Sequence, residues 1–185
     1  PCPLTGPFDM DRAPGGTAGF PENIDLVLEA SAWEALGLEA LATRAVRATL
    51  AHLRLPDDCG VSILATDDAR IATLNAEFRA RESATNVLSW PSEDLSAEEP
   101  GGGPLTPEAD LPGEPPFLGD IALAHETCAR EAAAGEKPLE DHVIHLIVHG
   151  LLHLLGYDHV HDPDADLMER LEVEILGKLG FPDPY

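Results

Sequence analysis

The chain has 185 residues and a mass of 19.7 kDa, and 44% of its residues are hydrophobic, so one domain with a sizeable core is expected. Its 34 acidic residues oppose 11 basic ones, giving a net charge of -23, which excludes a basic DNA-coating protein. No apolar run reaches the ~18 residues that span a bilayer. The three cysteines, Cys2, Cys59 and Cys128, form no Cys-x-x-Cys pair, which favours a reducing compartment, taken here as the cytoplasm.

The first third of the chain predicts a tail followed by alternating strands and a helix. Residues 1–22 contain several turn dipeptides and no period, so we expect a loose N-terminal tail. Ile24–Glu29 is a short, partly alternating apolar run that predicts a strand. Leu38–Leu53 carries apolar residues at helical spacing and predicts an amphipathic helix. Val61–Ala65 predicts a second strand.

A second helix and a third strand precede a sharp change of composition. Asp67 or Asp68 can cap a helix that runs to about Phe78. Asn86–Trp90 predicts a short strand. Residues 92–116, called the insertion below, hold seven acids, no base and many prolines and glycines. We expect the insertion to be solvated and mobile.

The last third of the chain predicts one strand and three helices. Leu118–Ala122 predicts a fourth strand, and Ala124–Ala134 and Leu139–Leu155 predict helices. Pro163 can open a last helix that runs to about Leu179. The sequence therefore predicts an α+β fold, with a small mixed four-stranded sheet packed against helices.

The residues that carry chemistry lie in one stretch, HGLLHLLGYDH. His149 and His153 are four residues apart, so a helix places them on one face. Gly156 is a residue type that ends helices, after which His159 can supply a third nitrogen. Three nitrogen ligands leave the fourth position of a tetrahedral zinc ion open, as in catalytic sites. Two packed or surface histidines would be the alternative, but the glycine and the third histidine disfavour it.

The same spacing occurs in the zinc-binding half of metzincin proteases. Those proteases carry a glutamate after the first histidine as the general base, whereas this chain has Gly150. A peptidase is therefore disfavoured.

Three segments together resemble the YbeY family of bacterial endoribonucleases and rRNA maturation factors. The first is the histidine stretch with the helix after it, which contains Met168, Glu172 and Ile175-Leu176. The others are LNAEFR running into TNVLSWP, and LGDI. The similarity covers about residues 24–180, with Trp90 where Phe is usual, Arg81 where Lys is common and Ala84 where Pro is common.

The resemblance implies a fold, an activity and a set of site residues. The activity is that of a single-strand-specific, metal-dependent endoribonuclease acting in 16S rRNA 3′-end maturation and ribosome quality control, carried by a single domain over residues 23–182. By position, His149, His153 and His159 would bind one zinc ion. Arg79 matches the family's functionally important arginine, and Arg79 and His149 are the predicted catalytic residues. The implied partners are single-stranded rRNA and the small ribosomal subunit with its proteins; neither a membrane nor DNA is expected.

Elementary chemistry is compatible with that activity. Zinc lowers the pKa of a bound water toward about 7 and polarises a phosphoryl oxygen, and an arginine can stabilise the charge that develops on the phosphate. For Arg81, exposure to solvent is as good an interpretation as a contact with phosphate. The general base stays open, because Asp158 can orient a ligand or cap a turn and His145 can support a ligand or simply pack.

The net charge is awkward for an RNA enzyme, because it repels phosphates at long range. We expect the seven acids of the insertion to be held away from the site. Lys137 and Lys178 are the only lysines, so RNA contacts must use arginines, and we expect weak, salt-sensitive binding aided by ribosomal proteins. Two alternatives stay open: a zinc hydrolase of peptides or esters, and a non-catalytic ribosome-assembly factor whose structural metal has a fourth protein ligand.

Overall fold

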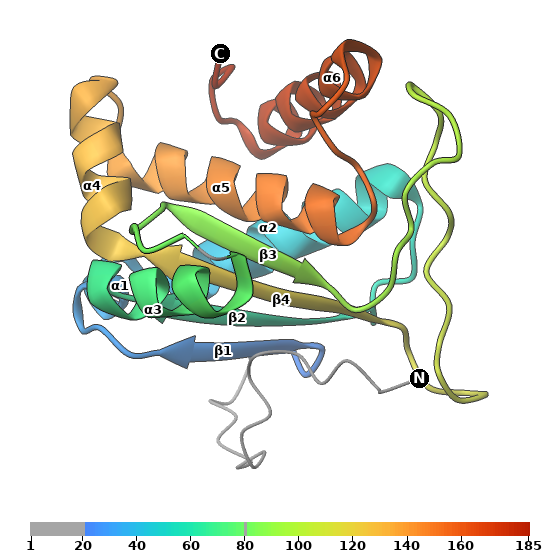
Figure 1. Cartoon of the computed structure of the whole chain (residues 1–185), viewed down its shortest axis with the longest axis horizontal. Helices are drawn as coiled ribbons and strands as arrows, with labels where there is room; N and C mark the ends of the chain where they lie inside the picture. Colours follow the sequence, from blue (N-terminus) through green and yellow to red (C-terminus); the bar gives the residue numbers. More distant parts are fainter. Residues whose placement is uncertain (1–20, 80) are drawn as a thin grey trace.

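The computed structural model describes residues 21–79 and 81–185, and the predicted tail lies almost entirely outside these residues. Figure 1 shows the arrangement of the strands and helices. In chain order they are β1 (Ile24–Leu28), α1 (Ala32–Leu36), α2 (Leu38–Leu53), β2 (Gly60–Thr66), α3 (Asp68–Arg79), β3 (Val87–Pro91), β4 (Phe117–Ala124), α4 (His125–Ala134), α5 (Leu139–Leu154) and α6 (Asp162–Leu179).

The four strands form one mixed sheet in the order β1-β2-β4-β3. β1 pairs with β2, and β2 with β4, in parallel, whereas β3 pairs with β4 antiparallel at the edge. In one row across the sheet, Ser62 lies opposite Asp25 on one side and Asp120 on the other. The predicted α+β class and mixed four-stranded sheet are confirmed.

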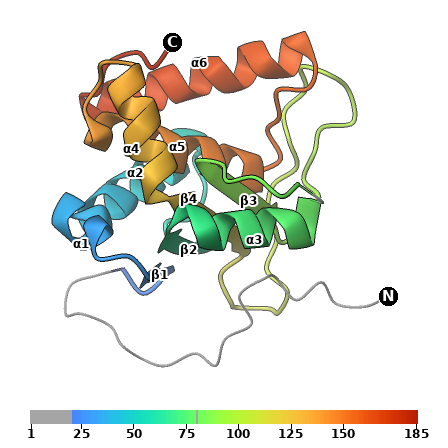
Figure 2. The same ribbon diagram turned by 60° about the vertical axis from the view of Figure 1, so that its left-hand side comes forward.

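Helices cover both faces of the sheet. Successive side chains of β4 point to opposite faces, and both faces are apolar, so each is buried under helices. Ile121 and Leu123 belong to the larger cluster, which α2 and α5 share. Ala122 and Ala124 belong to a smaller cluster with residues of α3. Figures 1 and 2 show α6 lying across α5 on the side away from the sheet. The predicted site helix α5 is thus packed between the sheet and α6.

One helix was not predicted from the sequence. α1 has five residues, too few to show a helical period, and Gly37 ends it in the left-handed conformation at φ 71°. Trp33 anchors it, because the ring is fully buried and the indole N–H donates to the Thr66 carbonyl at 2.9 Å. The structure also extends β4 through Ala124, so α4 begins one residue later than predicted.

The insertion contains no helix or strand, yet it packs against the rest of the molecule. Leu95 is 4% exposed, and its carbonyl accepts a hydrogen bond from the Leu105 N–H at 2.9 Å. The Gly101 N–H donates to Asp164 at the start of α6 at 2.6 Å, and Figure 2 shows the insertion rising to that end of the helix.

In the same residues 21–79 and 81–185, no helix is long and apolar enough to cross a membrane.

Candidate metal centre

The end of α5 sets the position of the histidine stretch. Gly156 adopts the left-handed conformation at φ +84°, its N–H donates to the His153 carbonyl, and the Tyr157 N–H donates to the Leu152 carbonyl at 3.0 Å. These two bonds form a Schellman motif, which satisfies carbonyls at the helix end and reverses the chain. The reversal brings His159 back beside the last turn of α5.

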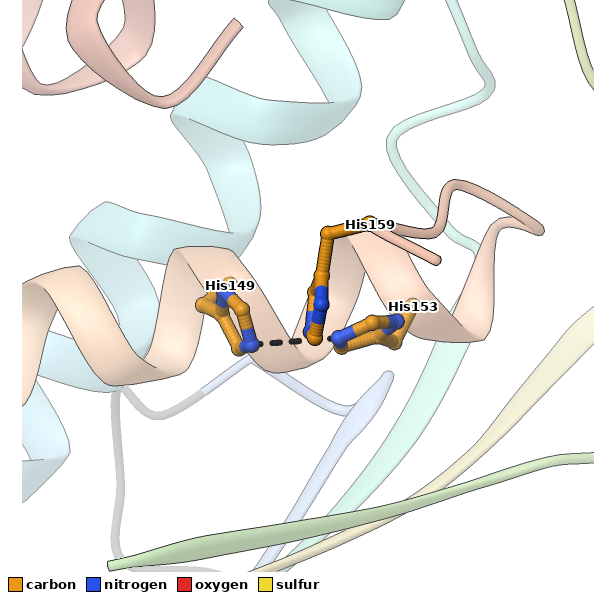
Figure 3. Close-up of side chains that lie close together, drawn as sticks. All are labelled: His149, His153 and His159. Atoms are coloured by element: carbon orange, nitrogen blue, oxygen red, sulfur yellow. Dashed lines mark hydrogen bonds between the residues drawn. The ribbon is translucent and has the colours of Figure 1, made fainter. Parts of the chain in front are cut away.

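Three histidines converge at this turn, as Figure 3 shows. His149 and His153 point the same way from α5, and the ring of His159 reaches back from the following loop. The ring centroids are 4.6 Å apart for His149 and His153, 5.5 Å for His149 and His159, and 5.0 Å for His153 and His159. One ring nitrogen from each lies within 4.8 Å of the others, so the three side chains could hold one metal ion.

The inner nitrogens of two of these rings are occupied by hydrogen-bond acceptors. The Nδ1–H of His149 donates to Glu172 Oε1 at 2.7 Å, and the Nδ1–H of His153 donates to the Tyr157 carbonyl at 3.0 Å. A carbonyl or carboxylate oxygen can only accept, so both rings carry their proton on Nδ1. In a neutral ring with its proton there, Nε2 has the lone pair, the form in which imidazole binds metals.

The two Nε2 atoms lie 3.1 Å apart, along the dashed line in Figure 3. Two lone pairs at that distance repel each other unless a proton or a cation lies between them. A tetrahedral zinc ion with Zn–N bonds of about 2.0–2.1 Å would separate its nitrogen ligands by about 3.3–3.4 Å. The donor set present in the chain thus fits a metal ion of this kind.

The ionisation of the surrounding groups supports this donor set. Burial, together with the neighbouring His149 and His159, lowers the pKa of His153 to about 4, so its ring is neutral near pH 7. Burial would raise the pKa of Glu172, but hydrogen bonds from His145, His149 and Tyr185 outweigh it and hold the pKa at about 2. Glu172 is therefore a buried anion that faces His149, one of the three candidate ligands.

The histidines lie in a cleft of about 690 Å³ between α5, β3 and the insertion. From the insertion, the lining includes Glu93, Asp94 and Leu95, and from β3 it includes Ser89. The expectation that all the acids of the insertion are held away from the site is therefore wrong for Glu93 and Asp94. The reason is the tertiary packing of Leu95, which brings the start of the insertion against the turn after α5.

Gly150 has a packing role at the position where metzincins carry their base. A Cβ atom there would lie 3.1 Å from Ile121 Cδ1 and 3.2 Å from Ser89 Oγ. The helix therefore approaches the sheet closely here, and any side chain larger than glycine would require Ile121 and Ser89 to shift. The structure supports the conclusion that the chain lacks a metzincin-type base.

The remaining candidate residues divide into those near the site and those outside it. Asp158 Oδ1 accepts from the His159 backbone N–H at 2.6 Å, in keeping with a role in the turn, and His145 reaches Glu172 at 3.3 Å. Arg79 is the last residue of α3, but its side chain lies outside what the structure describes. Arg81 is exposed and is not among the residues that line the cleft.

Four other histidines lie elsewhere in the molecule. They are His142, which binds Glu131 at 2.8 Å, His52, which pairs with Glu174 at 3.1 Å, His125, which packs edge-on against Trp33, and His161, which precedes α6 and is exposed. None of these four belongs to the described histidine cluster.

Two residues that contact the site were given no role by the sequence. Glu172 is fully buried and shares the apolar face of α6 with Met168, Ile175 and Leu176. An acid on an apolar helix face is the signal that could have identified it. The Tyr185 hydroxyl also donates to Glu172, and burial and the carboxylate raise its pKa, so it keeps its proton. No sequence pattern marks Tyr185.

Comparisons with known proteins identify the family of the chain. A profile of the family described as endoribonuclease YbeY matches residues 27–180. Two relatives named endoribonuclease YbeY, from Ruegeria pomeroyi and a Jannaschia species, are each 62% identical over 163 residues, or 88% of this chain and 97% and 99% of theirs. A relative of that name from Rhodopseudomonas palustris is 42% identical over 91% of this chain and 95% of its own.

A solved structure supports the fold alone. The solution structure of TM1509 from Thermotoga maritima matches with a TM-score of 0.52 and 20% sequence identity, covering 85% of this chain and 91% of that one. The profile match includes all three clustered histidines, and the alignments with the relatives extend over nearly their whole lengths. The chain belongs to the YbeY endoribonuclease family.

Proposed function

We propose that this chain is a zinc-dependent endoribonuclease that cleaves single-stranded RNA, acting in 16S rRNA 3′-end maturation and ribosome quality control. The observation that carries the proposal is the convergence of His149, His153 and His159 on one side of a cleft. Membership of the endoribonuclease family supplies the reaction class. Residues 23–182 are proposed to act as a single domain.

The chain's own residues divide the work of phosphodiester cleavage. His149, His153 and His159 would hold the metal ion through ring nitrogens, with His149 directly at the reacting centre. The metal would supply Lewis acidity, which lowers the pKa of water and polarises a phosphoryl oxygen. Arg79 is assigned to the negative charge that develops on the phosphate. A set of three imidazole ligands would favour zinc, although nickel, copper and iron also accept imidazole.

Two features bear on the alternatives retained from the sequence. A structural metal would have a fourth protein ligand, and within residues 21–79 and 81–185 the group formed by His149, His153 and His159 has three members; a second group of His145, His149 and Glu172 shares only His149 with it. A peptidase of the metzincin type would need a base where Gly150 packs on the sheet. Both features favour a hydrolase with another substrate, and the family points to RNA.

The proposed partners and compartment follow from the same function. Single-stranded rRNA would be the substrate, and the small ribosomal subunit with its proteins would help recruit this acidic chain. Cys59 and Cys128 are buried free thiols, which suits a reducing compartment such as the cytoplasm.

The proposal is tested with a labelled single-stranded RNA and the same RNA in a duplex. Purified wild type, His149→Ala and Arg79→Ala are compared with His161→Ala, which removes an exposed histidine outside the cluster. We expect wild type and His161→Ala to cut the single strand, His149→Ala to lose zinc and activity, and Arg79→Ala to keep zinc but lose activity. Equal cleavage by all four proteins would reject the proposal. Turnover of casein or an ester by wild type, with no turnover of RNA, would favour another hydrolase.

A further inference from the structure

Glu172 is buried and lies at the centre of a polar group formed by three separate parts of the chain. The residue sits on α6, His145 and His149 sit on α5, and Tyr185 follows the end of α6. Glu172 Oε1 accepts from His149 at 2.7 Å, and Glu172 Oε2 accepts from His145 at 3.3 Å and from the Tyr185 hydroxyl. The two carboxylate oxygens thus have different partners.

The division of partners has a consequence for the direction of His149. Oε1 contacts His149 alone among these three groups, while Oε2 is held on its far side by His145 and Tyr185. The carboxylate cannot rotate without breaking bonds to both of those residues. The oxygen facing His149 is therefore fixed in place, and in the neutral ring this places the proton of His149 on Nδ1 and the lone pair on Nε2.

We propose that Glu172, held by His145 and Tyr185, is the positioning residue that keeps His149 Nε2 directed at the metal. This inference deepens the proposed function and depends on it for the identity of the metal centre. Outer acceptors of this kind orient ligating histidines and raise their basicity. The equivalent acceptor for His153 is the backbone carbonyl of Tyr157, which no substitution can remove. The acceptor for His149 is a side chain, so replacing Glu172 can change the orientation of that ring.

A purely structural role is the competing explanation, because Glu172 also joins α6 to α5. Such a role would affect the free energy of unfolding but would leave the tautomer of His149 unchanged in any variant that still folds. The two explanations therefore differ in a property of the metal-free protein.

The main variant is Glu172→Gln, which keeps the size of the side chain and replaces two acceptor oxygens by one. The three groups then share a single oxygen, an amide NH2 takes the place of the other oxygen, and His149 no longer faces a group that can only accept. The matched control is Glu174→Gln, the same substitution on the same helix at an exposed position that pairs with His52 instead. Nitrogen-15 NMR of the metal-free proteins, well above the usual histidine pKa of about 6.5, reports the tautomer. Competition with a chromophoric chelator reports zinc affinity.

We expect wild type and Glu174→Gln to show the Nδ1–H tautomer of His149. We expect Glu172→Gln to show a gain of the Nε2–H tautomer and a loss of zinc affinity of about 10- to 100-fold. Tyr185→Phe keeps a largely exposed ring and removes only the hydroxyl that holds Oε2. For this variant we expect a shift in the same direction with an affinity loss below about 10-fold.

The proposal is overturned if Glu172→Gln keeps both the wild-type tautomer and the wild-type zinc affinity. Should Glu172→Gln fail to fold, Tyr185→Phe decides. An unchanged tautomer together with an unchanged zinc affinity in Tyr185→Phe would then overturn the proposal. Failure of wild type to bind zinc would instead count against the proposed function, because the NMR measurement needs no metal. The two failures can thus be told apart.

Discussion

Replacing Gly156 by alanine tests how tightly the insertion is packed against the metal centre. A Cβ atom at this position would lie 2.6 Å from the carbonyl carbon and oxygen of Leu95 and 2.9 Å from its Cβ. These are backbone atoms and the first side-chain atom, so no flexible side chain can rotate away. The insertion or the end of α5 must therefore move.

The magnitude follows from two separate costs. A non-glycine residue in the left-handed conformation costs about 1–2 kcal/mol, and overpacking a well-packed region adds about 1–3 kcal/mol. The matched control is Gly180→Ala at the end of α6, where φ is +83° and no heavy atom lies within 4 Å of the added Cβ. Gly180→Ala should pay only the first cost, so the difference between the two variants isolates the contact with Leu95.

The assay is thermal and urea-induced unfolding of the metal-free proteins. We expect Gly156→Ala to melt below Gly180→Ala by roughly 2–12 °C, taking about 2–4 °C per kcal/mol for a chain of this size. Limited proteolysis should also cut the insertion faster in Gly156→Ala alone, because the insertion is displaced from the turn. Equal melting temperatures and equal proteolysis of the two variants would refute the packing described between Leu95 and the end of α5.

Three further predictions follow from the charged groups. Removing metal with a chelator should lower the melting temperature, and zinc at 100 times its dissociation constant should restore about 2.7 kcal/mol; no change in the melting temperature on adding zinc would count against binding to the folded chain. Burial, only partly offset by Ser62, raises the pKa of Asp120 to about 6, so its contribution to stability falls as pH rises through 6. Asp120→Asn should therefore raise the free energy of unfolding by about 1–3 kcal/mol at pH 8 and by less at pH 5; an equal gain at both would contradict this. Glu93→Gln with Asp94→Asn should tighten RNA binding at low salt and leave it unchanged at high salt, whereas a gain that persists at high salt would exclude charge as its cause.

The elements with local signals were predicted closely. Leu38–Leu53 was predicted as a helix with the bounds it has in the structure, because its apolar face repeats over four turns. The histidine cluster was predicted because helical spacing and a left-handed glycine are local features that fix where side chains point. A five-residue helix such as α1 offers less than two turns of pattern, so its existence depends on the burial of Trp33 in the folded protein.

The features that were not predicted depend on contacts between distant parts of the chain. Glu172 and His149 are 23 residues apart in the sequence, and their contact exists because α6 packs across α5. The position of the insertion is also a tertiary effect, because its composition indicates solvation while the burial of Leu95 and the bond from Gly101 to Asp164 hold it against the rest of the molecule. Composition describes the average environment of a segment, whereas a few specific contacts, with Leu95 the buried one beside the histidines, place two of its acids at the cleft.

The acids at the cleft change how the net charge bears on RNA binding. A carboxylate close to the histidines repels phosphate directly, whereas distant acids act through a field that salt screens over about 8–10 Å. Glu93 Oε1 accepts from the Glu108 N–H at 3.3 Å, and Asp94 Oδ1 from the Ser96 N–H at 3.0 Å, so both carboxylates are engaged within the insertion. Hydrogen bonds with Ser96 lower the pKa of Asp94, which keeps it ionised. If a single strand of RNA is the substrate, we expect its phosphate to lie toward the histidines and its bases or ribose hydroxyls toward the insertion, because those groups can donate to a carboxylate and a phosphate cannot.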